Sequence, residues 1–279
     1  QAENTMYKGD KWFFDEFADR DPRLYDNIDK EGLRLEGSVA VYAATGYFAH
    51  LFVNPDLKTV PGGMSSTNIT DAPVMKLNEV MMNYIEAAAE LADMGQYTLT
   101  QGDFDKTINA LRNRPSTSMP AVTLAGSNLA VNGVTINDPD RDKGQMKSGD
   151  YEVSPILWEV RRERRTELPY QGIRFNDLRR WGKLHYADMK VNPKLNLGAW
   201  LDKDAYVAWF NEQNGTSLTV EDLKGIHLDR EGNAGYIVPA IDASLLRTCE
   251  DKHYLYPIPS QEIALYQSNG YTLSQNPGW

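Results

Sequence analysis

Cysteine is almost missing from this sequence, because Cys249 is the only one among 279 residues. A single thiol excludes a framework of internal disulfides. As a catalytic nucleophile, Cys249 would need a positioned base, and no catalytic motif surrounds it. An inert thiol is therefore the better interpretation.

Long apolar runs are missing too. No stretch approaches the roughly 18 residues that a membrane-spanning helix needs. The first ten residues have neither the basic start nor the apolar core of a secretory signal. The chain is therefore either a cytosolic protein or a processed or truncated piece of a longer one.

Basic residues are fewer than acidic residues. The sequence has 29 Lys and Arg residues against 39 Asp and Glu residues, which gives a net charge of −10 at pH 7. An acidic surface repels the phosphate backbone, so no nucleic-acid partner is expected.

Compact motifs of the common enzyme classes are also lacking. The four histidines are too far apart to form a zinc signature, at His50, His185, His227 and His253. The sequence has no phosphate-binding glycine loop and no nucleophile elbow. A glycoside hydrolase remains an alternative, because folding brings its two carboxylates together and leaves no compact motif.

One acidic stretch resembles the start of a calcium-binding loop. Asp138, Asp140 and Asp142 stand at alternate positions. The sixth position of such a loop requires glycine and the twelfth glutamate, but here these are Lys143 and Gly149. A solvated acidic loop without a cofactor is the favoured interpretation, with Ca²⁺ as the alternative.

Apolar periodicity predicts a mainly helical chain with much irregular structure. The best helix covers residues 76–94, and a second covers 103–113. The first has an apolar stripe at steps of three and four residues, made by Leu77, Val80, Met81, Tyr84, Ala88 and Leu91. Such a pair cannot bury both apolar faces alone and usually stacks on other pairs.

The remaining segments alternate between helices and loops. Residues 1–75 are expected to be rich in loops, and residues 116–150 to form a long polar loop with a possible hairpin at Asn132-Gly133. Ser154-Pro155 is typical of a helix start and predicts a helix to about Leu168. Further helices are expected over 175–181, 203–213, 220–224 and 260–266, with residues 185–250 otherwise irregular.

The helix predicted from Ser154 carries a dense mixture of charges. Glu163 and Glu167 share one face of it, as a catalytic carboxylate pair would. The many neighbouring arginines, however, hold a carboxylate ionised with a lowered pKa, which does not suit a general acid. A structural network of ion pairs is the favoured interpretation.

Aromatic residues suggest where a ligand binds. The chain has 15 Tyr and 6 Trp against 8 Phe. Tyrosine and tryptophan combine an apolar ring with a hydrogen-bonding O–H or N–H group, which suits hydrated surfaces that bind a partner. Candidate ligand-binding residues in the irregular region are Trp200, Tyr206, Trp209 and Tyr236. Flat rings stack on sugars, but the same rings also pack helices onto a core, and for any single ring packing is the favoured alternative.

Three segments together resemble the SusD/RagB family. They are Glu163–Leu168 followed by Gly172–Gly182, then Tyr254–Ile263, and finally Gln275–Trp279. Weaker similarity lies at Asp19–Leu24, Thr45–Tyr47 and Leu77–Ala88, so that the resemblance spans Asp19 to Trp279 in the family's order.

The resemblance implies a mainly α-helical protein built on tetratricopeptide-type helix pairs with a large loop-rich lobe. Residues 76–113 resemble the last helix pair, and 116–150 and 185–250 the variable loop regions. Family members are longer on the N-terminal side, so the chain resembles a C-terminal portion without the signal peptide, the lipid-bearing cysteine and the earlier helices.

The resemblance also implies a location and partners. It suggests a lipid-anchored protein on the extracellular face of the outer membrane of a Bacteroidota-type bacterium, joined to its own N-terminal portion. Its partner would be a SusC-like TonB-dependent transporter, to which it passes oligosaccharides without being an enzyme.

The shared family motifs imply a scaffold and not a ligand site. In this sequence they assign packing and ion pairs to Glu163, Arg164, Glu167, Arg174, Asp177, Trp181, Tyr256, Pro257, Pro259, Asn276, Pro277 and Trp279. Glycan capture is thus the first hypothesis. Oligopeptide capture by a RagB-like complex, a glycoside hydrolase and a helical-repeat adaptor are the alternatives.

Overall fold

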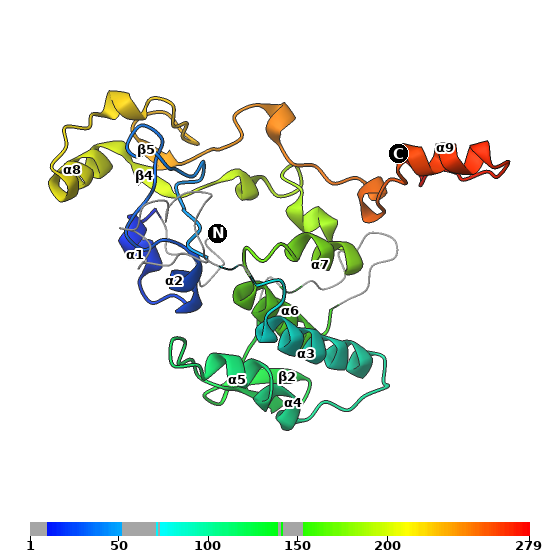
Figure 1. Cartoon of the computed structure of the whole chain (residues 1–279). Helices are drawn as coiled ribbons and strands as arrows, with labels where there is room; N and C mark the ends of the chain where they lie inside the picture. The colour runs from blue at the N-terminus through cyan, green and yellow to red at the C-terminus, as the bar shows by residue number, and fades with distance from the viewer. Residues whose placement is uncertain (1–9, 52–70, 72, 139–140, 142–152) are drawn as a thin grey trace.

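The computed structural model describes residues 10–51, 71, 73–138, 141 and 153–279, and it is mainly helical, as predicted (Figure 1). The lower body contains α3 (Leu77–Asp93), α4 (Gln101–Asp105), α5 (Ile108–Arg112) and α6 (Pro155–Glu167). The upper lobe contains α1 (Phe13–Phe17), α2 (Arg23–Asn27), β4 (Trp200–Asp202), α8 (Lys203–Asn214) and β5 (Ala234–Tyr236). Between and beyond them lie α7 (Arg174–Arg180) and the projecting α9 (Ser260–Ser268).

Short helical turns fill much of the irregular region. They are the 3₁₀ helices η2 (Leu184–Ala187), η3 (Pro193–Asn196), η4 (Val220–Leu223), η5 (Ala243–Leu245) and η6 (Asp251–Tyr254). The helix predicted over 220–224 is therefore a single 3₁₀ turn. Where the structure describes residues 1–75 they are rich in loops, as expected, and they also contain the short helices α1 and α2.

Several predicted helix boundaries are confirmed by their capping groups. The side-chain oxygen of Ser154 accepts a hydrogen bond from the backbone N–H of Leu157 at 3.2 Å, and Pro155 occupies the first turn of α6. Asp202 caps α8 in the same way through Ala205, and Gly215 ends that helix with a φ of 63°.

Most of the apolar stripe predicted on α3 is exposed. Leu77, Val80 and Tyr84 are 68%, 48% and 40% exposed, whereas Met82 and Ile85 are fully buried. The helix has two apolar faces, and α6 packs on the second one. Periodicity shows that a face is apolar but does not show which of two apolar faces a neighbour covers.

The helix predicted over 103–113 is two short helices. The carboxylate of Asp103 accepts hydrogen bonds from the backbone N–H and hydroxyl of Thr100, at 2.9 and 2.8 Å, so α4 begins earlier than predicted. The hydroxyl of Thr107 donates to the backbone carbonyl of Asp103 at 2.5 Å at the break before α5. Such a local bond competes with the helical ladder.

Residues 116–150 are more ordered than predicted where the structure describes them. Strands β1 (Val122–Ala125), β2 (Asn128–Val131) and β3 (Val134–Thr135) form an antiparallel meander. The hairpin at Asn132-Gly133 is confirmed, with φ values of 50° and 77°. Buried Val122 and Leu129 join the core of α3, α5 and α6, so this segment is part of the body.

Buried ion pairs connect the upper lobe to the lower body. The carboxylate of Glu163 accepts hydrogen bonds from the guanidinium of Arg23 at 2.7 Å and from that of Arg112 at 2.7 Å. Glu167, one turn later, accepts from Arg23 at 3.1 Å and from Arg114 at 2.8 Å. These two carboxylates therefore join α2, α5 and α6.

A second network joins α3, α6 and α7. Arg164 donates to Asp177 at 2.8 Å and lies 3.5 Å from Glu86. The indole N–H of Trp181 donates to Glu86 at 2.5 Å. The guanidinium of Arg174 lies 5.1 Å from the Trp181 ring centre, and desolvation together with the charge of Arg165 lowers the pKa of Arg174 to about 10.

The two proline-containing tail segments bind each other. The side-chain amide of Gln275 both accepts from and donates to the backbone of Ile258, at 2.7 and 2.8 Å, between Pro257 and Pro259. The Asn276 amide, next to Pro277, donates to the carbonyl of Tyr256 at 2.6 Å. The indole N–H of Trp279 donates to the carbonyl of Lys252 at 2.9 Å. The Tyr256 ring in turn stacks on Arg179 of α7, 3.8 Å from the guanidinium carbon.

Replacing Glu163 by Gln should lower the free energy of unfolding by about 3–5 kcal/mol, because it leaves Arg23 and Arg112 buried without their shared anion. Urea denaturation at pH 7 measures the change. The control is Glu221→Gln, because Glu221 is 78% exposed in its pair with Lys224 and should cost at most about 1 kcal/mol. Equal effects of the two substitutions would contradict a structural role for Glu163.

The same variant should change how stability depends on pH. Burial raises the pKa of Glu163, but the Arg112 hydrogen bond and the charges of Arg23 and Arg112 outweigh it, so the pKa lies below its ordinary value. A lowered pKa contributes stability above the pKa of the unfolded chain, about 4.3, and this contribution is lost as pH falls further. The difference in the free energy of unfolding between the wild type and Glu163→Gln should therefore shrink as the pH falls below about 5. A constant difference in urea midpoints over that range would refute the assignment.

Candidate functional site

Two of the four predicted ring residues lie in the core of the upper lobe. Tyr206 is fully buried, and its hydroxyl contacts the Ser38 hydroxyl at 2.9 Å. The Trp209 ring packs edge-on to Trp12, with ring centres 5.9 Å apart. Its outer edge lies so close to Gly32 that a side chain there would approach it to 2.6 Å. These positions favour packing, so we leave Tyr206 and Trp209 out of the candidate site.

The other two predicted rings form a pair at the surface of the lobe. Trp200 and Tyr236 are directly opposite each other in the antiparallel β4–β5 pair. Their ring centres are 5.2 Å apart at an interplanar angle of 73°, and both side chains are half-buried. We call Trp200, Tyr236 and the neighbouring Arg230 the ring platform.

Strand alternation explains why these rings lie on the outer face. Leu201, next to Trp200, is fully buried, and Gly235, next to Tyr236, is buried as its cross-strand partner. Successive side chains of a strand point to opposite faces, so Trp200 and Tyr236 share the face away from the core. A side chain at position 235 would come within 2.7 Å of the Asp229 carboxylate. Glycine at position 235 therefore allows the loop that contains Asp229 to pass close to β5.

That loop places a charge pair over the rings. The guanidinium carbon of Arg230 lies 5.0 Å from the Trp200 ring centre and 5.9 Å from that of Tyr236. Asp229 fixes this position by accepting from Arg230 at 3.0 Å and from the backbone N–H of Tyr236 at 2.8 Å. The hydrogen bond from Arg230 is the main cause of the lowered pKa of Asp229.

The platform combines the groups that recognise a sugar. Aromatic faces contact the C–H face of a pyranose, and an ionised pair beside them supplies donors and acceptors for hydroxyls. Trp200 and Tyr236 were candidates from the sequence, whereas Asp229 and Arg230, which the structure places beside them, were not. Their signal was a charged Asp-Arg pair in the turn before a strand that carries a candidate ring.

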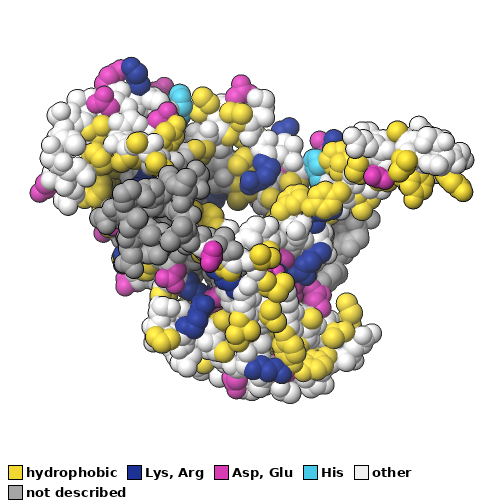
Figure 2. Space-filling view, viewed as in Figure 1, with side chains coloured by type: hydrophobic (Ala, Val, Ile, Leu, Met, Phe, Trp, Pro, Cys, Tyr) yellow, Lys and Arg dark blue, Asp and Glu magenta, His cyan; other side chains and the backbone are white. Residues whose placement is uncertain are grey.

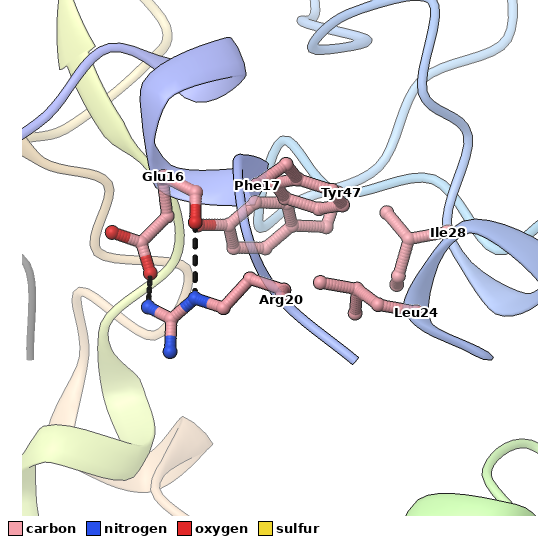
Figure 3. Close-up of a pocket in the computed structure, with 6 residues that line it drawn as sticks. All are labelled: Glu16, Phe17, Arg20, Leu24, Ile28 and Tyr47. Atoms are coloured by element: carbon pink, nitrogen blue, oxygen red, sulfur yellow. Dashed lines mark hydrogen bonds and ion pairs between the residues drawn. The ribbon is translucent and has the colours of Figure 1, made fainter. Parts of the chain in front are cut away.

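A concave feature lies between α1 and α2. Figure 3 shows its lining by Glu16, Phe17, Arg20, Leu24, Ile28 and Tyr47. The Arg20 guanidinium pairs with Glu16, so the two charges neutralise each other. Burial raises the pKa of Tyr47 to about 12, which keeps its phenol neutral at pH 7. The feature is mostly apolar and offers a ligand few polar groups.

The structure tests the acidic stretch only in part. Asp138 accepts a hydrogen bond from the indole N–H of Trp158 at 2.8 Å, while Asp140 and Asp142 lie outside the described residues. Within the described ranges, no group of three or more potential metal-ligating side chains is close enough to hold an ion. Among those same residues, no helix is both long and apolar enough to cross a membrane.

The candidate catalytic carboxylates have other partners. Glu163 and Glu167 each contact at least two guanidinium groups and are 2% and 5% exposed. A general acid in a glycosidase needs a raised pKa, whereas the arginines lower the pKa of Glu163. This pair therefore does not fit glycoside hydrolysis.

The fold is a helical body with a pair of surface rings on an irregular lobe. The sequence matches the SusD family over residues 1–279, and the chain belongs to that family. No curated protein matches it.

Two solved structures from Bacteroides fragilis are similar to the chain. A SusD-like protein matches with a TM-score of 0.51 and 20% identity, covering 95% of this chain and 40% of its own. A SusD-like carbohydrate-binding protein matches with a TM-score of 0.49 and 24% identity, covering 94% and 43%. The chain thus spans about two fifths of the length of these structures.

Proposed function

We propose that the chain belongs to a surface protein that captures oligosaccharides and delivers them to a transporter without chemical change. The observation that carries this proposal is the half-exposed Trp200–Tyr236 pair with Arg230 held over it. Family membership supports it, because SusD family proteins are binding proteins. One structural relative is described as a carbohydrate-binding protein.

Oligopeptide capture is the second candidate, and the platform favours glycans over it. A peptide site needs main-chain donors and acceptors, usually along an open strand edge. At the platform the backbone N–H of Tyr236 is already bonded to Asp229, and its carbonyl accepts from the N–H of Asp229 at 2.9 Å. The groups left for a ligand are rings and side-chain charges.

The transporter partner follows from the family. We propose a SusC-like TonB-dependent transporter in the outer membrane, with the protein on the extracellular side and held by a lipid on an N-terminal segment. The family assignment over 1–279 supports this. A pull-down from outer membranes with the tagged full-length protein tests it, since co-purification of a TonB-dependent transporter is expected.

An apolar stripe on α3 supports a further intramolecular partner. Its exposed residues follow steps of three and four along the helix: Leu77, Val80, Tyr84, Ala87, Leu91 and Met94. Figure 2 shows hydrophobic side chains gathered over this part of the lower body. The SusD-like structure has a chain of which this one covers 40%. We propose that a helix from the remaining, N-terminal portion covers the stripe, with 76–113 as the last tetratricopeptide-type pair.

Replacing both Leu77 and Leu91 by Lys should reduce binding of a hydrophobic dye to the 279-residue chain while leaving its unfolding midpoint unchanged, because both side chains are exposed. In a longer chain that includes the N-terminal portion, the same double substitution should lower the midpoint. The control is Val191→Lys, which is 58% exposed outside the stripe. Destabilisation of the 279-residue chain would show that the stripe packs internally.

Trp200→Ala should weaken oligosaccharide binding by about 1–3 kcal/mol, on the scale of stacking on an aromatic ring. Isothermal titration with plant, host and microbial oligosaccharides measures the change. Tyr271→Ala is the matched control, because Tyr271 is 68% exposed and lies on the tail. Unchanged affinity for Trp200→Ala would remove the platform as the site, and tighter binding of peptides than of any glycan would favour the second candidate.

A further inference from the structure

A second concavity in the upper lobe lies away from the ring platform. It encloses about 270 Å³ between residues 35–45 and residues 225–245. Its polar side chains are Glu36, Tyr42 and His227, and its apolar surface includes Ile226 and Ile237. This volume is slightly below the range of about 300–1,000 Å³ for drug-sized ligands. It suits a single ring or side chain.

Backbone hydrogen bonds order each wall separately. The N–H of Val238 donates to the carbonyl of His227 at 2.9 Å, which extends the β5 ladder along one wall. The loop of the other wall is closed by the Ala43 N–H bond to the Arg34 carbonyl at 3.1 Å. At Gly37, with a φ of 89°, a side chain would come within 2.1 Å of the carbonyl oxygen of Asp222. The loop thus lies tightly against the segment that precedes the other wall.

The rim of the concavity presents hydrogen-bonding groups that are open to a ligand. The Tyr42 hydroxyl donates to Oε1 of Glu36 at 3.2 Å, which positions the carboxylate. Among the described residues, Oε2 of Glu36 and the His227 imidazole have no hydrogen-bond partner. All three side chains are exposed. An ionised carboxylate oxygen accepts strongly, and an imidazole supplies both a donor and an acceptor.

We infer that this concavity is a second saccharide subsite, which takes one sugar ring of an oligosaccharide. The aliphatic floor of Ile226 and Ile237 matches the C–H face of a pyranose. The carboxylate of Glu36 accepts from adjacent hydroxyls while His227 binds a third. A cationic side chain is the competing ligand, but the pocket offers it a single carboxylate that already accepts from Tyr42. This inference rests on the proposed function.

The subsite is separate from the ring platform. Ile237 directly follows Tyr236, and adjacent strand residues point to opposite faces. Ile237 is 3% exposed and pairs with Leu228, whereas Tyr236 faces Trp200 on the outer face. Each site therefore has its own spectroscopic reporter.

Methyl and indole NMR signals test the inference on the intact chain. With isoleucine methyls and tryptophan indoles labelled, we expect a binding oligosaccharide to shift Ile226 and Ile241, which line the subsite, in addition to the Trp200 indole. Glu36→Gln should weaken the response of the methyls about tenfold or more, because a charge-assisted acceptor is lost. Glu212→Gln, an exposed carboxylate on α8, should leave it unchanged.

The outcomes separate the two sites. A shift of the Trp200 indole with unmoved methyls overturns the subsite and leaves the platform standing. Moving methyls in Trp200→Ala protein support the subsite even if the platform fails. A methyl response to lysine-containing peptides and to no glycan overturns the saccharide assignment. No response of any reporter to any oligosaccharide overturns both the subsite and the proposed function.

Discussion

The carboxylate of Glu163 lies buried between the guanidinium groups of Arg23 and Arg112, and the rest of the structure depends on this contact. Arg23 belongs to α2 in the upper lobe, and Arg112 to α5 in the lower body. A buried ion pair contributes little net energy, but removal of one partner leaves uncompensated charge. The arrangement therefore fixes how the lobe is attached to the body, and so where the ring platform lies.

The charged motifs join the helices of the body to one another. Glu86 accepts from Trp181 and pairs with Arg164 and Arg180, which joins α3, α6 and α7. The tail then joins α7 through Tyr256 and Arg179. Side chains fixed in this way are not free to contact a ligand. The lobe that carries Trp200 and Tyr236 is thus attached to a frame held by paired charges.

The sequence predicted local features that depend on local chemistry. The Ser154 cap and the Asn132-Gly133 turn followed from short-range rules. An ion-pair network around Glu163 was also predicted, but with arginines of its own helix, whereas its partners Arg23 and Arg112 lie on distant segments of the chain. It did not predict which apolar face of α3 is covered, because both faces have the right period. Among the rings, Trp200 and Tyr206 looked alike, and only the pairing of β4 with β5 and the fold of the lobe separate a surface ring from a core ring. The pocket beside Glu36 joins segments about 190 residues apart, so no local sequence pattern could predict it.

We propose that the protein holds an oligosaccharide and releases it intact. The most direct measurement is equilibrium binding of an oligosaccharide that the purified protein captures, with the same sugar recovered and analysed by mass spectrometry after prolonged incubation. We expect saturable binding and recovery of the unchanged sugar. Shortened products, or an absence of binding across a broad glycan panel, would contradict it.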